Sequence, residues 1–163
     1  MNLDNFDLEY LLLIAMKSEI ESNRLYGKMA NKTQNGLLED KLKFLAGEEE
    51  KHREFIEEIY LNHFPDKKII IPEKTKVPLP EIQYSEETPM SILLNQAMEA
   101  EQAASDFYRS LSDRFEEGTK MQNTLIYFSD MELGHYKMLE MEKQSMERFE
   151  EADVYWPMVH AGP

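Results

Sequence analysis

The feature of this sequence that most constrains its fold is a spacing of glutamate and histidine residues that occurs twice. Each copy has a lone glutamate, followed 30 or 31 residues later by Glu-x-x-His. Residues three apart lie on one face of an α-helix, so each Glu-x-x-His pair can offer a carboxylate and an imidazole to a common point. Together the two copies indicate a carboxylate-bridged site for two metal ions in the core of a helix bundle. The six candidate ligands are Glu19, Glu49, His52, Glu101, Glu132 and His135.

The sequence around the six candidate ligands is also repeated. Residues 15–19 align with residues 97–101, and Tyr26 aligns with Tyr108, at an offset of 82 residues. The segments that hold the Glu-x-x-His pairs align at an offset of 83. An internal duplication of a helix pair is the simplest explanation.

Four segments have hydrophobic residues at intervals of three or four, which predicts four helices. The expected helices cover about 5–30, about 37–63, a third that ends before Gly118, and about 120–149. The third is expected to begin with Thr88 as N-cap and Pro89 at the first helical position. Because each candidate ligand interrupts an apolar stripe, all six are predicted to point inward.

Between the second and third helices, about 64–87, the sequence has four prolines and no helical period. This segment predicts a long crossover, within which residues 69–71, three isoleucines, are expected to lie extended on the bundle. The fold class is therefore predicted to be all-α, a four-helix bundle with a long crossover. Residues 1–149 are expected to form one domain, because each helix pair supplies only three candidate ligands. The apolar tail, 150–163, is expected to dock on the bundle or on a second subunit.

Composition narrows the possible functions. The sequence contains no cysteine, which excludes disulfides, zinc fingers and iron–sulfur centres within it. A net charge of −14 disfavours binding to nucleic acid or to an anionic membrane. No signal peptide or membrane span is found, so a cytoplasmic location is predicted.

With this ligand pattern and crossover, the sequence resembles the ferritin-like superfamily and, within it, the rubrerythrin-type di-iron carboxylate proteins. The resemblance extends over most of the chain and implies that Glu49 and Glu132 bridge the two ions. It implies that the other ligands are terminal, with Glu19 and His52 on one ion and Glu101 and His135 on the other.

Two departures from the rubrerythrin pattern are present. Rubrerythrins carry a cysteine-rich rubredoxin domain, which this sequence lacks. They also usually carry a further glutamate one turn after the first glutamate of the third helix, where this chain has Ala104. Bacterioferritins have a similar set of six ligands, but the crossover and tail here are less like those of a cage-forming ferritin.

The resemblance implies a non-haem di-iron oxidoreductase that reduces hydrogen peroxide or O2 with electrons from an external, rubredoxin-like donor. Two iron ions are the expected cofactors, manganese is an alternative, and zinc would be an inactive occupant. Three other functions remain open: ferroxidase and iron handling, a non-enzymatic interaction module stabilised by its metals, and manganese catalase. We expect a homodimer.

Other polar residues have two interpretations each. Tyr26 and Tyr108 lie seven residues after the lone glutamates, so they are either core aromatics or hydrogen-bond donors to carboxylates across the site. Glu48 either orients an imidazole or belongs to an exposed acidic run. His63 and His160 have no partner at ligand spacing and are expected to be structural or at the surface.

Overall fold

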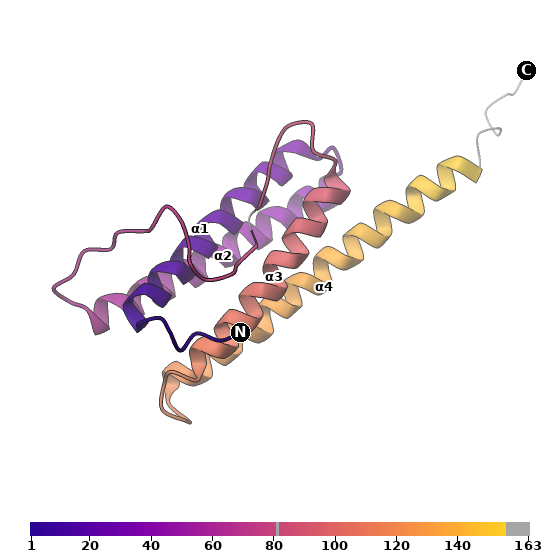
Figure 1. The fold of residues 1–163 in the computed structure, drawn as a ribbon. Coiled ribbons are helices and arrows are strands. Elements are labelled where there is room, and N and C mark those ends of the chain that lie inside the picture. Colours follow the sequence, from indigo (N-terminus) through magenta and orange to yellow (C-terminus); the bar gives the residue numbers. More distant parts are fainter. Residues whose placement is uncertain (81, 156–163) are drawn as a thin grey trace, which may run out of the picture.

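The structure, a computed structural model, describes residues 1–80 and 82–155, with side chains as far as residue 148. Within these residues it contains α-helices and no strand, which confirms the predicted all-α class. The four helices in Figure 1 are α1 (Leu8–Lys32), α2 (Gly36–His63), α3 (Met90–Ser112) and α4 (Lys120–Tyr155).

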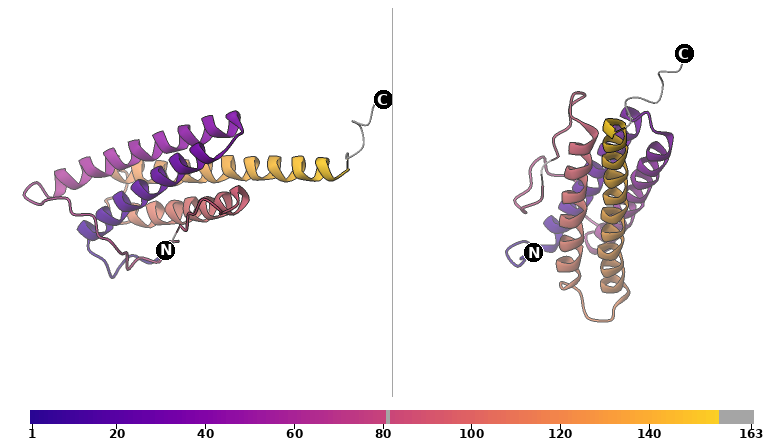
Figure 2. Two further views of the ribbon diagram at one scale, coloured as in Figure 1. Left: turned by 90° about the horizontal axis from the view of Figure 1, so that it is seen from above. Right: turned by 90° about the vertical axis from the view of Figure 1, so that its right-hand side faces the viewer.

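The helices form two antiparallel pairs. α1 packs along α2, α3 packs along α4, and the two pairs lie side by side (Figures 1 and 2). The crossover, residues 64–89, returns along the length of the bundle, so α2 and α3 run in the same direction. The predicted four-helix bundle with one long crossover is therefore confirmed.

The starts of α1 and α2 are set by side chains that cap them. The Asp7 carboxylate accepts a hydrogen bond from the Tyr10 backbone N–H at 2.8 Å. The Asn35 side chain accepts from the backbone N–H groups of Leu37 and Leu38 at 3.0 and 3.3 Å. Each such cap satisfies N–H groups that have no partner inside the helix, and is worth about 1 kcal/mol.

The predicted start of α3 is wrong by one residue. Pro89, with extended backbone angles, occupies the N-cap position, and no side chain caps the helix. The Thr88 hydroxyl instead lies 2.9 Å from the Ser85 hydroxyl and accepts from the Ser85 N–H at 3.2 Å. A hydroxyl that forms hydrogen bonds within the preceding turn cannot cap the helix, because turns and helix caps compete for such side chains.

The turn before α4 contains Gly118, whose φ of 77° lies in the left-handed region that favours glycine. The predicted end of α4, about 149, is also wrong, because the helix continues to Tyr155 and projects beyond the other three (Figure 1). No glycine or proline interrupts residues 150–155. The predicted docking of the tail concerns side chains after residue 148 and the chain after Tyr155, which lie outside the described residues.

The crossover lies on the bundle through alternate side chains. Ile69 and Ile71 pack against the core, whereas Ile70 between them is 72% exposed. Further along, Val77 is buried, and the Lys76 N–H donates to the Tyr10 hydroxyl at 2.8 Å. The isoleucine segment therefore lies extended on the bundle, as expected, without forming a strand.

The apolar core has two parts. The first core cluster includes Leu12, Ile56, Leu111 and Leu125. The second core cluster includes Met29, Leu42, Leu94 and Leu139. In every helix the candidate ligands lie between residues of the two clusters, so apolar packing above and below fixes the helices that carry them. Full burial of each large apolar side chain in these two clusters contributes about 1.5–3 kcal/mol to the stability of the fold.

No helix within the described residues has the length and the hydropathy that a membrane span needs. The cytoplasmic location and the homodimer remain predictions.

Candidate metal centre

The six candidate ligands meet at the middle of the bundle, from all four helices. α1 and α3 each contribute one glutamate, and α2 and α4 each contribute a Glu-x-x-His pair. All six are buried, with exposed fractions from 0% for Glu132 to 4% for His135. Each takes the place of a hydrophobic residue on an inward stripe, so the packing that buries the stripe also buries the ligand.

The donor atoms form two groups that could each hold a metal ion. One group is Glu19, Glu49, His52 and Glu132, and the other is Glu49, Glu101, Glu132 and His135. Within each group, one donor atom from every residue lies within 4.8 Å of all the others. Glu49 and Glu132 belong to both groups, which is the arrangement that two bridging carboxylates require. Among the described residues, no further carboxylate joins either group.

Polar atoms at this centre approach one another closely without satisfying each other. His52 Nδ1 lies 2.9 Å from Glu132 Oε1, yet neither atom has a hydrogen-bond partner among the described residues. Glu49 Oε1 and His52 Nε2 also lack a partner there. Each unsatisfied buried polar group costs about 1–3 kcal/mol, and more when charged. Metal ions that accept these lone pairs would remove that cost, so the residues present fit a pair of bound ions.

The four carboxyl groups differ in their protonation equilibria. Burial raises the pKa of Glu19 and Glu101 well above the usual value, and the charge of Glu49 raises both further. Burial also opposes the ionisation of Glu49 and Glu132, but the close approach of the two imidazoles outweighs it and lowers the pKa of both. The two shared carboxylates are therefore the ones that ionise most readily.

The protonation equilibria of the two imidazoles are shifted toward the charged form. Burial opposes a charge on His52 and His135, but the carboxylates that lie close to each ring raise the pKa of both. The largest such effect comes from Glu132 on His52 and from Glu101 on His135. Without metal, the centre therefore retains protons that bound ions would displace.

Two tyrosine hydroxyls reach the centre from the opposite helix pair. Tyr26 of α1 donates a hydrogen bond to Glu101 of α3, and Tyr108 of α3 donates to Glu19 of α1. Both tyrosines are buried, and burial followed by the charge of the glutamate that each contacts raises their pKa well above the usual value. The hydroxyls therefore stay protonated and orient one oxygen of each lone glutamate.

Removing one of these hydroxyls should weaken metal binding. We expect Tyr108→Phe to lower the affinity of the Glu19 group for its ion about tenfold, because the carboxylate loses the donor that orients it. Competition with a chromophoric chelator measures the change. Tyr127→Phe is the matched control, since Tyr127 is 59% exposed and has no contact with the centre. Equal affinities for the two variants would contradict the role given to Tyr108.

The sequence analysis did not identify a role for Phe128. Its ring lies 4.3 Å from that of His52, centroid to centroid, and 5.6 Å from that of Tyr108. The repeat places Leu45 at the equivalent position in the first pair, so only one of the two imidazoles has an aromatic neighbour of this kind. This difference between the two copies is the only signal in the sequence, and it does not show which ring Phe128 contacts.

A second contact not predicted joins α3 to α4. The hydroxyls of Ser105 and Ser129 lie 3.0 Å apart, and both residues are buried. At the equivalent positions in the first pair, Asn23 donates its side-chain N–H to the Ala46 carbonyl at 2.7 Å. Each pair therefore has one polar contact about a turn from its own ligands, built from different residues.

His63 and Glu48 are not part of the centre. Glu48 is half-buried and forms an ion pair with the exposed Lys51 at 2.5 Å. His63 Nδ1 lies 3.0 Å from the Ile59 carbonyl, at the end of α2. Ala104, at the position where rubrerythrins usually carry a further glutamate, is a half-buried residue of α3. His160 lies outside the described residues.

Comparisons with known proteins agree with this geometry. The rubrerythrin family model matches residues 10–143, a range that includes all six candidate ligands. A solved structure described as hypothetical protein Pfu-1136390-001 from Pyrococcus furiosus is similar, with 29% identity and a TM-score of 0.78 over 91% of this chain and 95% of that one. A comparison with curated proteins gives no match. Since the family model matches most of the sequence, the chain belongs to the rubrerythrin family.

Proposed function

We propose that this protein is a non-haem di-iron oxidoreductase that reduces hydrogen peroxide or O2 with electrons from an external donor. The observation that carries the proposal is the pair of buried ligand groups that share Glu49 and Glu132. Two ions held by such groups would share two carboxylates and could act on one small molecule together. Family membership supports the same class of centre.

The donor atoms favour iron or manganese over softer metals. Carboxylate and imidazole ligands suit iron or manganese, whereas soft metals prefer the thiolates that this sequence lacks. Zinc accepts the same donors but has no redox chemistry. An iron pair, when bound, would supply two electrons to a peroxide or to O2.

The protein's own residues hold and shield such a pair. The six candidate ligands fix the two positions, and the tyrosine hydroxyls of α1 and α3 hold the lone glutamates in place. The two core clusters close the centre on both sides, so that water is largely excluded. A low-dielectric surrounding of this kind strengthens electrostatic interactions within the site.

The proposed electron donor is a separate, rubredoxin-like protein. The sequence has no cysteine to ligate an iron–sulfur or rubredoxin centre, and no Gly-x-Gly-x-x-Gly loop for a flavin or nicotinamide. Electrons for a second turnover would therefore come from outside these 163 residues.

Rapid mixing with peroxide tests the proposal. Loaded with Fe(II), the protein should consume about one peroxide per iron pair in a single fast phase, since each peroxide takes up two electrons and two protons to give two water molecules. Turnover should then stop and resume when a reductase and a rubredoxin-like donor are added. Stopped-flow absorbance with a peroxide assay measures both phases.

The other functions give different results in this experiment. Continuous peroxide loss with oxygen evolution and no donor would indicate catalase activity. Continuous uptake of Fe(II) into a polynuclear product would indicate iron storage. No redox change on adding peroxide would leave the metals with a structural role only. Any of these three outcomes would contradict the proposed oxidoreductase.

A further inference from the structure

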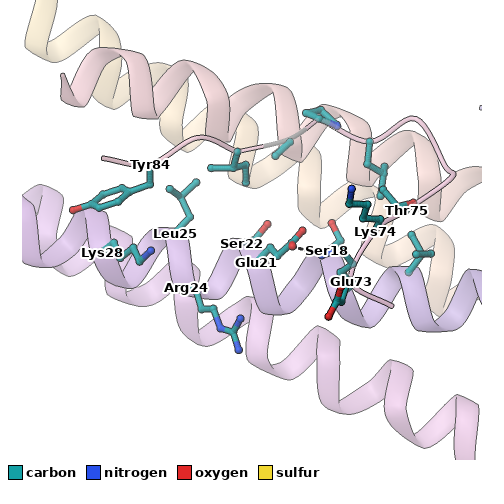
Figure 3. A pocket seen from close by; sticks show the side chains of 16 residues that line it. Ser18, Glu21, Ser22, Arg24, Leu25, Lys28, Glu73, Lys74, Thr75 and Tyr84 are labelled. Carbon is teal, nitrogen blue, oxygen red and sulfur yellow. Dashed lines mark hydrogen bonds and ion pairs between the residues drawn. The ribbon is translucent and has the colours of Figure 1, made fainter. Parts of the chain in front are cut away.

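A pocket of about 440 Å³ lies between α1 and the crossover, separate from the metal centre (Figure 3). Its lining comes from the outer side of α1, from the crossover, and from Ala100 of α3. None of the six candidate ligands lines it. The volume is within the range of about 300–1,000 Å³ that is usual for small-molecule sites.

The pocket exists because the crossover follows both parts of the core but does not fill the space between them. Leu79 of the crossover packs against the first core cluster, and Ile82 and Tyr84 pack against the second. Beneath this segment, α1 presents Ser18 and Ser22, whose side chains are too small to reach the crossover. The result is a cavity with apolar walls and a polar floor.

Cationic side chains are concentrated around this pocket, in a chain whose net charge is −14. Lys17, Arg24, Lys28 and Lys74 line it, against two carboxylates, Glu21 and Glu73. Lys17 forms an ion pair with Glu21. Among the described residues, the other three cations form no ion pair with a carboxylate. Among the residues that the structure describes, no ion pair therefore neutralises the positive charge of Arg24, Lys28 or Lys74.

Two of these cations lie toward opposite ends of the pocket. Figure 3 shows Lys28 with Tyr84 at one end and Lys74 with Thr75 toward the other, with Ser18 and Ser22 between them. The Lys28 amine lies 4.9 Å from the centre of the Tyr84 ring, which restricts its position. From Ser18 to Lys28 the helix rises about 15 Å, so the pocket is elongated.

We propose that this pocket binds a small organic anion, with a carboxylate or phosphate group attached to an apolar body. Lys74 or Lys28 would pair with the anionic group, and the serine hydroxyls would donate hydrogen bonds to it. Leu25, Leu79 and Ile82 would contact the apolar body. Small-molecule sites usually have a few polar groups on an otherwise apolar wall. The proposal does not depend on the chemistry of the metal centre.

Titration calorimetry of the metal-loaded protein tests this site with four compounds: phenyl phosphate, benzoate, inorganic phosphate and benzyl alcohol. We expect saturable binding of phenyl phosphate and benzoate, weaker binding of inorganic phosphate, which lacks the apolar body, and none of the neutral alcohol. Lys74→Glu should weaken binding of the two organic anions about tenfold or more, since it replaces an attractive charge by a repulsive one. Lys28→Ala should weaken it about fivefold.

Lys137→Glu is the matched control, because Lys137 is an exposed residue of α4 and its reversal changes the net charge equally. It should change binding less than about twofold. Absence of saturable binding of both organic anions would overturn the proposal, and so would equal weakening by the two charge reversals. Binding that persists in Lys74→Glu and disappears when the metals are removed would place the anion at the metal centre and would also overturn it.

Discussion

Replacing Glu49 or Glu132 with alanine should reduce bound iron from about two ions per chain to one or none. Each of these carboxylates belongs to both ligand groups, so its loss removes a donor from both ions at once. By contrast, Glu19→Ala or Glu101→Ala removes a donor from one group only, and should lower the affinity of one ion more than that of the other. Metal analysis of fully loaded, desalted protein measures the stoichiometry.

Glu54→Ala is the control for these variants, since Glu54 lies on the exposed side of the same helix as Glu49. It should bind metal as the unchanged protein does. A stoichiometry of one or less in the unchanged protein, unaffected by Glu49→Ala and Glu132→Ala, would refute the assignment of the six candidate ligands.

Removal of the metals should destabilise the protein strongly. An ion that binds only the folded chain, at a free concentration about 1,000 times its Kd, contributes about 4 kcal/mol to the free energy of unfolding. For a domain of this size, that loss corresponds to a fall in Tm of about 10 °C or more. The carboxylates left behind also repel one another, which adds to the loss.

The apo protein should regain stability as the pH falls from neutral toward about 5. The pKa of Glu19 and Glu101 is raised by folding, so the cost of ionising them disappears as the pH falls through the folded pKa toward the unfolded value of 4.5. The raised pKa of the two imidazoles also stabilises the folded apo protein as the pH falls. This contribution to stability is complete below pH 6.5, the usual imidazole pKa. The lowered pKa of the two shared glutamates has the opposite sign, but that contribution is lost only as the pH falls below about 4.5.

Thermal melting with and without chelator, between about pH 5 and about pH 8, measures both effects. The two curves should lie far apart at neutral pH and approach each other in acid, where protons compete with the metals for the same atoms. The Glu49→Ala/Glu132→Ala double variant should show no difference between the curves. Indistinguishable curves for the unchanged protein would mean that the ligands are misassigned.

The fold was predictable from the sequence because its signals are local and repeated. Helical period, the turn at Asn35, the glycine after α3 and the proline-rich crossover each depend on a few neighbouring residues. The inward positions of the six candidate ligands followed from the same period, since Glu19 and Glu101 stand where hydrophobic residues belong. Which carboxylate lies beside which imidazole depends on how the helices pack, so helical period alone did not give the two four-residue groups, which the family resemblance implied and the structure shows.

The features that were missed depend on contacts between segments distant in the sequence. Phe128 became informative only when its ring was found against His52. Thr88 has the right chemistry for a cap, but Ser85 competes for its hydroxyl. The pocket beneath the crossover leaves no pattern in the sequence, because its cations come from α1 and from a loop whose path no periodicity specifies.

The sharing of ligands between the two helix pairs has a mechanical consequence. Each group of four takes at least one carboxylate from the pair to which its histidine does not belong, so any ion bound in either group ties one half of the chain to the other. Without metal, the halves are joined covalently only through the crossover. A sequence with no cysteine has no disulfide to restrain such halves, and two bound ions would serve as removable cross-links between ligands that lie at least about 50 residues apart in the sequence.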